Sequence, residues 1–163
     1  MKKLIITALF GLAFSAIAAA QLPSVEVQDI DGAKFDTALI VDGKTPAVIS
    51  FWAVTCKPCI QELDAINEAL EEWREEADFR VVAVSVDDTR FNAKAKALTS
   101  SHGWSDFTLL FDVNSDFKRA MNVVQTPQVF VVDTEGKIIY SHTGYTPGGE
   151  ELLLEAILKI AEK

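Results

Sequence analysis

Residues 51–60 read Phe-Trp-Ala-Val-Thr-Cys-Lys-Pro-Cys-Ile and contain both cysteines of the chain, Cys56 and Cys59. An apolar run ends at the first cysteine, and a strongly helical stretch begins directly after it. The start of a helix offers unpaired backbone N–H groups and a partial positive charge, and both stabilise a thiolate relative to a thiol. Cys56 is therefore the predicted nucleophile. Cys59, one helical turn later, is the predicted resolving thiol, which attacks the mixed disulfide that Cys56 forms.

The segments on either side of this pair alternate between strand and helix patterns. Residues 47–53 are almost continuously apolar, which is typical of a central strand buried on both faces. From Pro58 onward the apolar residues fall at helical spacing, which predicts an amphipathic helix that ends near Ala77 and Asp78. Residues 79–86 are rich in β-branched side chains and predict a second interior strand.

The rest of the chain continues the alternation. The other expected elements are a hairpin over 25–35 around Asp31-Gly32, a helix from Asp87 or Asp88 to about His102, a strand over 107–111, a short helix over 116–121, a hairpin that pairs 129–132 with 138–142, and a closing helix opened by Gly148-Gly149. The residues of that closing helix expected to face the sheet are Leu152, Leu153, Ala156, Ile157 and Ile160. Together these elements predict an α/β fold with a mixed sheet flanked by helices.

The first twenty residues have the pattern of an export signal. Two lysines precede an apolar stretch, and Ala18-Ala19-Ala20 provides a small-residue cleavage site before Gln21. Cleavage there leaves residues 21–163 as one domain. An uncleaved membrane anchor is the alternative, because the apolar stretch lies at the short limit for a membrane-spanning helix.

Charge and cysteine content narrow the possible functions. The chain has 24 acidic against 15 basic residues and a formal net charge of −9, so it lacks the basic surface that nucleic-acid phosphates require. In an exported protein a single cysteine pair normally suggests a structural disulfide. A two-residue loop, however, constrains the unfolded chain very little, so the spacing of Cys56 and Cys59 favours redox chemistry instead.

Three segments resemble a known family. They are Phe51-Trp52-Ala53 with Cys56-Lys57-Pro58-Cys59, then Glu62-Leu63, and finally Thr126-Pro127-Gln128-Val129-Phe130-Val131-Val132-Asp133 with Gly136-Lys137. Over about residues 22–163 the chain is similar to the exported thioredoxin-fold reductases of the TlpA/ResA type. It departs from their pattern at Thr55, where a tryptophan is common. It also has Ser50 where thioredoxins often carry a buried acid.

The resemblance implies a fold, an activity and a set of partners. It implies a thioredoxin-like domain with an N-terminal β-hairpin extension, and a periplasmic thiol–disulfide oxidoreductase that reduces disulfides of other exported proteins. It also implies re-reduction by a membrane thiol donor. Cytochrome c maturation is the most familiar use of such proteins. No cofactor or metal is expected, and we expect a monomer.

The same resemblance suggests roles for residues around the cysteines. Glu62 is expected to be the acid that handles protons beside the thiols, although its position alone fits a solvated glutamate equally well. Lys57 and Pro58 form the dipeptide between the cysteines, and Pro58 suits the first helical turn. Thr126 and Pro127 are expected to bind substrate through a cis peptide bond, while a trans proline at a strand edge is the alternative.

The aromatic side chains and the histidines receive simpler interpretations. Trp52 is expected to flank the active site and contribute to substrate binding, whereas Trp73 and Trp104 are expected to be packing residues. His102 and His142 lack any partner pattern, so both are expected at the surface. A zinc site needs about four ligands, and these two histidines do not supply ligand spacing.

Two other functions fit parts of the pattern. A thiol peroxidase can share this fold, but the Thr-x-x-Cys spacing is absent, since Thr55 directly precedes Cys56. A metal-binding or delivery module that uses the cysteine pair is the non-enzymatic alternative. Retention of copper or zinc at one ion per chain distinguishes that module from an oxidoreductase.

Overall fold

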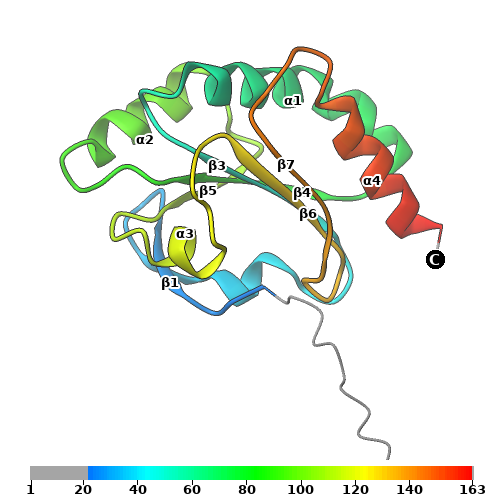
Figure 1. Ribbon diagram of the computed structural model, residues 1–163, viewed down its shortest axis with the longest axis horizontal. Coiled ribbons are helices and arrows are strands. Elements are labelled where there is room, and N and C mark those ends of the chain that lie inside the picture. The colour runs from blue at the N-terminus through cyan, green and yellow to red at the C-terminus, as the bar shows by residue number, and fades with distance from the viewer. Residues whose placement is uncertain (1–21, 163) are drawn as a thin grey trace, which may run out of the picture.

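A mixed β-sheet forms the centre of the molecule (Figure 1). The computed structural model describes residues 22–162, so the expected export signal over 1–20 lies outside the described residues. The helices and strands are β1 Glu26–Asp29, β2 Lys34–Asp36, the short 3₁₀ helix Thr37–Ile40, β3 Ala47–Trp52, α1 Lys57–Glu76, β4 Arg80–Ser85, α2 Asn92–Ser101, β5 Thr108–Phe111, α3 Asp116–Ala120, β6 Gln128–Val132, β7 Ile138–Thr143 and α4 Glu151–Ala161.

The strand order is β2-β1-β5-β4-β3-β6-β7. The three inner strands β3, β4 and β5 are parallel, because α1 and α2 provide the crossover connections between them. The pairs β6–β7 and β1–β2 are antiparallel hairpins at the two ends of the sheet. The expected thioredoxin-like fold with its N-terminal hairpin is confirmed.

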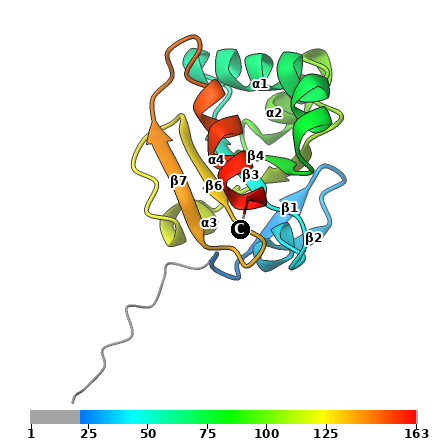
Figure 2. The same cartoon turned by 90° about the vertical axis from the view of Figure 1, so that its right-hand side faces the viewer.

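Strand β3 is buried along its whole length because helices cover both faces of the sheet. Side chains alternate across the strand, so Val48 and Trp52 pack with residues of α1 and α4, whereas Ile49 and Phe51 pack with α3. Figures 1 and 2 show the same division, with α1, α2 and α4 on one side of the sheet and α3 on the other.

Two predicted helix features need correction. Helix α2 begins at Asn92 rather than at Asp87 or Asp88. Asp87 accepts a hydrogen bond from the backbone N of Val54, just after β3, and Asp88 turns the chain by accepting one from the backbone N of Arg90. In α4 the expected core residue Leu152 is 46% exposed, whereas Leu154 is only 9% exposed. Leu152 and Leu154 lie on either side of Leu153, which is at the centre of the apolar face of the helix. The orientation of α4 on the sheet determines which of the two leucines is buried.

Candidate active site

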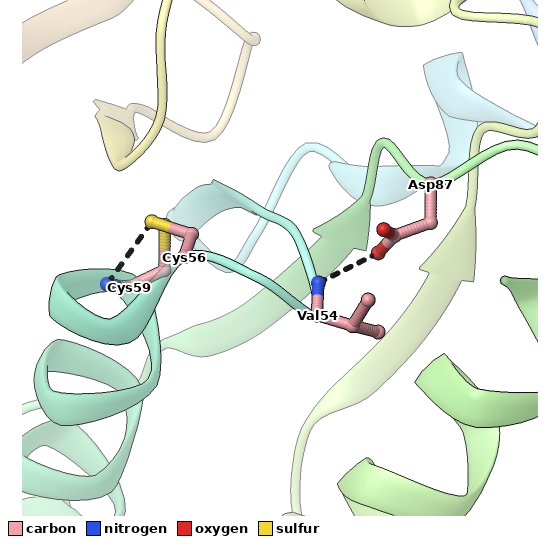
Figure 3. Close-up of a disulfide and its surroundings, with 4 residues drawn as sticks. All are labelled: Val54, Cys56, Cys59 and Asp87. Atoms are coloured by element: carbon pink, nitrogen blue, oxygen red, sulfur yellow. Dashed lines mark hydrogen bonds between the residues drawn. A yellow bond between two sulfur atoms is a disulfide. The ribbon is translucent and has the colours of Figure 1, made fainter.

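The two cysteines occupy the first turn of α1 and differ in exposure. Cys56 is the N-cap residue and is half-buried, whereas Cys59 is fully buried. The structure contains the Cys56–Cys59 disulfide, and Sγ of Cys56 accepts a hydrogen bond from the backbone N of Cys59 at 3.3 Å (Figure 3). Pro58 also fits this turn, because the N–H that it lacks has no partner within the helix. The partly exposed sulfur is therefore the one that receives stabilisation from the helix start.

Asp87 holds the loop that presents Cys56. Its Oδ2 accepts hydrogen bonds from the backbone N of Val54 and from the hydroxyl of Ser85, both at 2.9 Å. Figure 3 shows the first of these contacts, which joins the end of β4 to the segment between β3 and α1. Sequence reasoning assigned Asp87 to a helix cap, and it missed this contact because the two partners are 33 residues apart.

Glu62 is a buried carboxyl group beneath the same helix. Its side chain has no exposed surface, and its Oε1 lies 2.6 Å from Nε2 of His142. Burial raises the pKa of the Glu62 carboxyl above its ordinary value, and the hydrogen bond and charge of His142 oppose that rise. The alternative of a solvated glutamate is therefore wrong for this position. The role of Glu62 in proton handling stays a prediction.

Both histidines pair with carboxylates of α1, which corrects the expectation that they are unpaired surface residues. His142 exposes 19% of its side chain and contacts Glu62. His102 lies 2.8 Å from Asp64 through Nδ1, and the indole of Trp104 donates to the same Asp64 oxygen at 2.9 Å. The alternation Tyr140-Ser141-His142-Thr143 could have indicated an inward-facing His142, since strand residues two apart share one face.

The Thr126–Pro127 peptide bond is cis, as the resemblance implied. Pro127 is buried and Thr126 is half-buried, directly before β6. The register pairs Phe51 with Gln128, so Pro127 reaches the edge of the sheet at which the loop to Cys56 begins. Substrate binding by Thr126 and Pro127 stays a prediction.

Trp52 lies in the core beneath the site, and substrate binding by Trp52 stays a prediction. Its side chain has no exposed surface, because the indole lies beneath the site and packs edge-on against Trp104 with ring centroids 5.2 Å apart. Trp104 and Trp73 are buried packing residues, as expected. Lys57 and Pro58 are exposed beside the disulfide, so the dipeptide forms part of the accessible surface there.

The described residues 22–162 provide neither a cluster of three candidate metal ligands nor a helix with the length and apolar character to cross a bilayer. What the site does bring together is one accessible sulfur, one buried sulfur and one buried carboxyl group on the first two turns of α1. This arrangement allows exchange of disulfides, with the accessible sulfur attacking and the buried sulfur resolving.

Comparisons with known proteins point to the same chemistry. A protein-family model described as the AhpC/TSA family matches residues 18–141. The chain is 29% identical to the thiol:disulfide interchange protein DsbE of Yersinia pestis over 80% of this chain and 66% of that protein. It is 26% identical to the thiol-disulfide oxidoreductase ResA of Bacillus thuringiensis subsp. konkukian, over 76% of this chain and 68% of that protein.

A solved structure is also similar. The thioredoxin-like protein from Porphyromonas gingivalis superposes with a TM-score of 0.76 and 43% identity, covering 86% of this chain and 92% of that one. The chain spans about two thirds of the length of the curated relatives described above. The names of the relatives confirm the resemblance to the ResA group and the expected enzyme class, thiol–disulfide oxidoreductase.

Proposed function

Since the chain belongs to the AhpC/TSA family, we propose that it is a thiol–disulfide oxidoreductase of the DsbE and ResA type that reduces disulfides in exported proteins. The observation that carries the proposal is the hydrogen bond from the backbone N of Cys59 to Sγ of Cys56 at the start of a 20-residue helix. That contact and the helix dipole favour a thiolate at Cys56 over a thiol.

The reaction uses the two sulfurs in order. In the reduced protein the Cys56 thiolate attacks one sulfur of the substrate disulfide, forms a mixed disulfide and releases the other substrate sulfur as a thiolate. Cys59 then loses its proton and attacks Sγ of Cys56. The mixed disulfide breaks, the second substrate thiolate leaves, and the Cys56–Cys59 disulfide forms, so two electrons pass from the protein to the substrate.

The place of action and the partners follow from the sequence and from the family. The pattern of residues 1–20 supports export to the periplasm. Substrates are then disulfide-bearing exported proteins, with cytochrome c maturation as the most familiar setting, and a membrane thiol donor re-reduces Cys56 and Cys59. The exposed Lys57-Pro58 dipeptide and the backbone edge at Thr126-Pro127 are the proposed contacts for a substrate polypeptide.

Two measurements test the activity and its direction. The purified protein is expected to accelerate insulin reduction by dithiothreitol, and its Cys56 is expected to react with iodoacetamide at a pH well below the pKa of free cysteine. In glutathione buffers, a reduction potential below about −230 mV supports a reductant, whereas a value near −120 mV identifies an oxidant. Ordinary thiol acidity together with no insulin reduction would falsify the proposal.

A Cys59→Ser variant separates this proposal from its alternatives. Without the resolving thiol, the variant is expected to accumulate mixed disulfides with its substrates through Cys56. A Cys56→Ser variant is the control and is expected to trap nothing. Rapid turnover of hydrogen peroxide by the wild type would favour a thiol peroxidase instead, and retention of copper or zinc at one ion per chain would favour a metal-binding module.

A further inference from the structure

The Glu62–His142 pair lies at a place where three strands and one helix meet. The register aligns Ser50 of β3, Val129 of β6 and His142 of β7 in one row across the sheet. Val129 packs in the core that α1 covers, so His142 points toward the same helix. Cys59 and Glu62 are three residues apart on α1, and both are fully buried against the sheet, so they are neighbours on one helical face.

We propose that His142 is a positioning residue for disulfide exchange: it binds Oε1 of Glu62 and leaves Oε2 as the oxygen that exchanges a proton with Cys59. This inference rests on the proposed function, because it concerns the resolving step at Cys59. In that step the thiol of Cys59 gives its proton to Oε2, and the Cys59 thiolate attacks Sγ of Cys56. The substrate sulfur leaves as a thiolate.

The two carboxylate oxygens of Glu62 differ in their hydrogen bonding. Oε1 is 2.6 Å from Nε2 of His142, whereas Oε2 is buried and has no hydrogen-bond partner among the described residues. A buried oxygen without a partner costs free energy unless it gains a proton or a donor. Oε2 is therefore the oxygen of Glu62 that is free to accept a proton from a neighbouring thiol.

His142 also connects the buried carboxyl group with the surface. Glu62 has no exposed surface, whereas His142 is partly exposed and lines a surface pocket together with Tyr145 and Gly149. Solvent reaches part of the His142 ring, whereas Nδ1 of that ring is buried and has no hydrogen-bond partner among the described residues.

The charges around the pair make His142 the member that stabilises an ionised Glu62. Glu150 raises the pKa of Glu62 further, so it opposes ionisation. The other titratable groups facing the pair are Tyr140, Tyr145 and Glu155. Burial and the charges of Glu62 and Glu155 raise the pKa of Tyr140. Burial and the hydrogen bond to Glu150 raise the pKa of Tyr145 to about 12. None of these groups brings a positive charge to Glu62.

Two substitutions separate the hydrogen bond of His142 from its charge. His142→Gln retains a donor but loses the cation, and His142→Phe loses both. Without the cation, the Glu62 titration midpoint is expected to rise by about one pH unit or more. At a pH below both midpoints, the resolving step should slow about tenfold, because the rate follows the fraction of ionised Glu62. The matched control is His102→Gln, which alters the other histidine–carboxylate pair of α1 and is expected to leave this step unchanged.

The test uses two readouts on the full-length protein. NMR of ¹³C-labelled glutamate follows the Glu62 carboxyl as the pH changes, and single-turnover stopped flow measures the resolving step from pH 5 to 9. A double-mutant cycle with Glu62→Gln completes the design, because substitution of His142 should have no further effect on that step once Glu62 cannot ionise.

The outcomes are distinct. A higher Glu62 midpoint, a pH profile displaced in the same direction and non-additive effects with Glu62→Gln support the inference. Unchanged profiles in His142→Gln and His142→Phe, or fully additive effects, overturn it. If His142→Phe does not fold, His142→Gln decides the question alone. Failure of the wild type to reduce any disulfide refutes the proposed function instead, and the Glu62 titration still shows whether His142 controls that carboxyl group.

Discussion

At the level of single residues, the site combines opposite electrostatic environments over a few positions. The Cys56 sulfur lies at the positive end of α1 and accepts a backbone hydrogen bond, which favours its anionic form. Glu62 lies one turn beyond Cys59 in the core, where burial favours the neutral form of its carboxyl group. The helix start therefore activates a nucleophile, and the helix interior keeps a group that can hold a proton.

The buried Glu62 makes stability depend on pH. Its folded-state pKa is raised, so between the ordinary value of 4.5 and that raised pKa the folded protein binds more protons than the unfolded chain, and the unfolding free energy falls as pH rises. Below 4.5 Glu62 is protonated in both states, and above the raised pKa it is ionised in both, so it contributes no slope in either range. In a Glu62→Gln variant the unfolding free energy is expected to lack this decrease with pH. The decrease in the wild type is expected to be about 1.4 kcal/mol for each unit by which the Glu62 pKa is raised.

Urea unfolding from pH 4 to 9 measures this difference between wild type and Glu62→Gln. The control is Glu68→Gln, which removes a negative charge from the exposed face of the same helix. Parallel stability curves for wild type and Glu62→Gln over the whole range would contradict a buried Glu62 with a raised pKa.

At the level of elements, the position of the α1 start depends on a contact from β4. The backbone N of Val54 and the hydroxyl of Ser85 both donate to Asp87, which ties the segment before Cys56 to the adjacent parallel strand. Parallel neighbours end at the same edge of the sheet, so a side chain after one strand can reach the loop after the next. The nucleophile is therefore presented by two elements rather than by its own helix alone.

An Asp87→Ala variant is expected to destabilise the protein by about 1–3 kcal/mol, because the part-buried N–H of Val54 loses its acceptor. Urea unfolding gives the free energy, and amide hydrogen exchange of Val54 is expected to become faster. Asp88→Ala is the control, because Asp88 forms an exposed pair with Arg90 and its loss should destabilise the protein much less. Equal effects of the two substitutions would show that Asp87 does not anchor the loop.

At the level of the whole molecule, the central sheet is covered by helices and the chain as a whole is strongly acidic. Both faces of β3 are closed by helices, while the chain has a formal net charge of −9 and its ion pairs between carboxylates and lysine or arginine are largely exposed. Exposed pairs contribute little, so repulsion among the carboxylates is the larger electrostatic effect on the compact state.

The melting temperature is therefore expected to rise as NaCl increases from about 10 mM to about 150 mM, since salt screens repulsion between exposed charges. Differential scanning calorimetry at pH 7.5 measures the change. The same series near the isoelectric point of about 4.7 is the control, and the increase is expected to disappear there because the net charge is close to zero. A melting temperature that falls with salt at pH 7.5 would show that attractive ion pairs dominate.

The strand–helix–strand unit around Cys56 and Cys59 could be predicted from the sequence alone. The apolar run of β3, the helical spacing after Pro58 and the chemistry of a helix start are local properties, so a few neighbouring residues suffice to predict them. The cis bond before Pro127 came from a family resemblance rather than from local pattern, because an isolated X–Pro bond favours trans.

Which polar groups are buried together depends on long-range packing and could not be predicted from local sequence. Glu62 looks like one acid among many on a charged helix, and it becomes a buried group because His142, 80 residues later, covers it from β7. Trp52 is fully buried for the same reason, since Trp104 and the surrounding core enclose it. Burial depends on which distant segments pack over a side chain, and no local pattern contains that information.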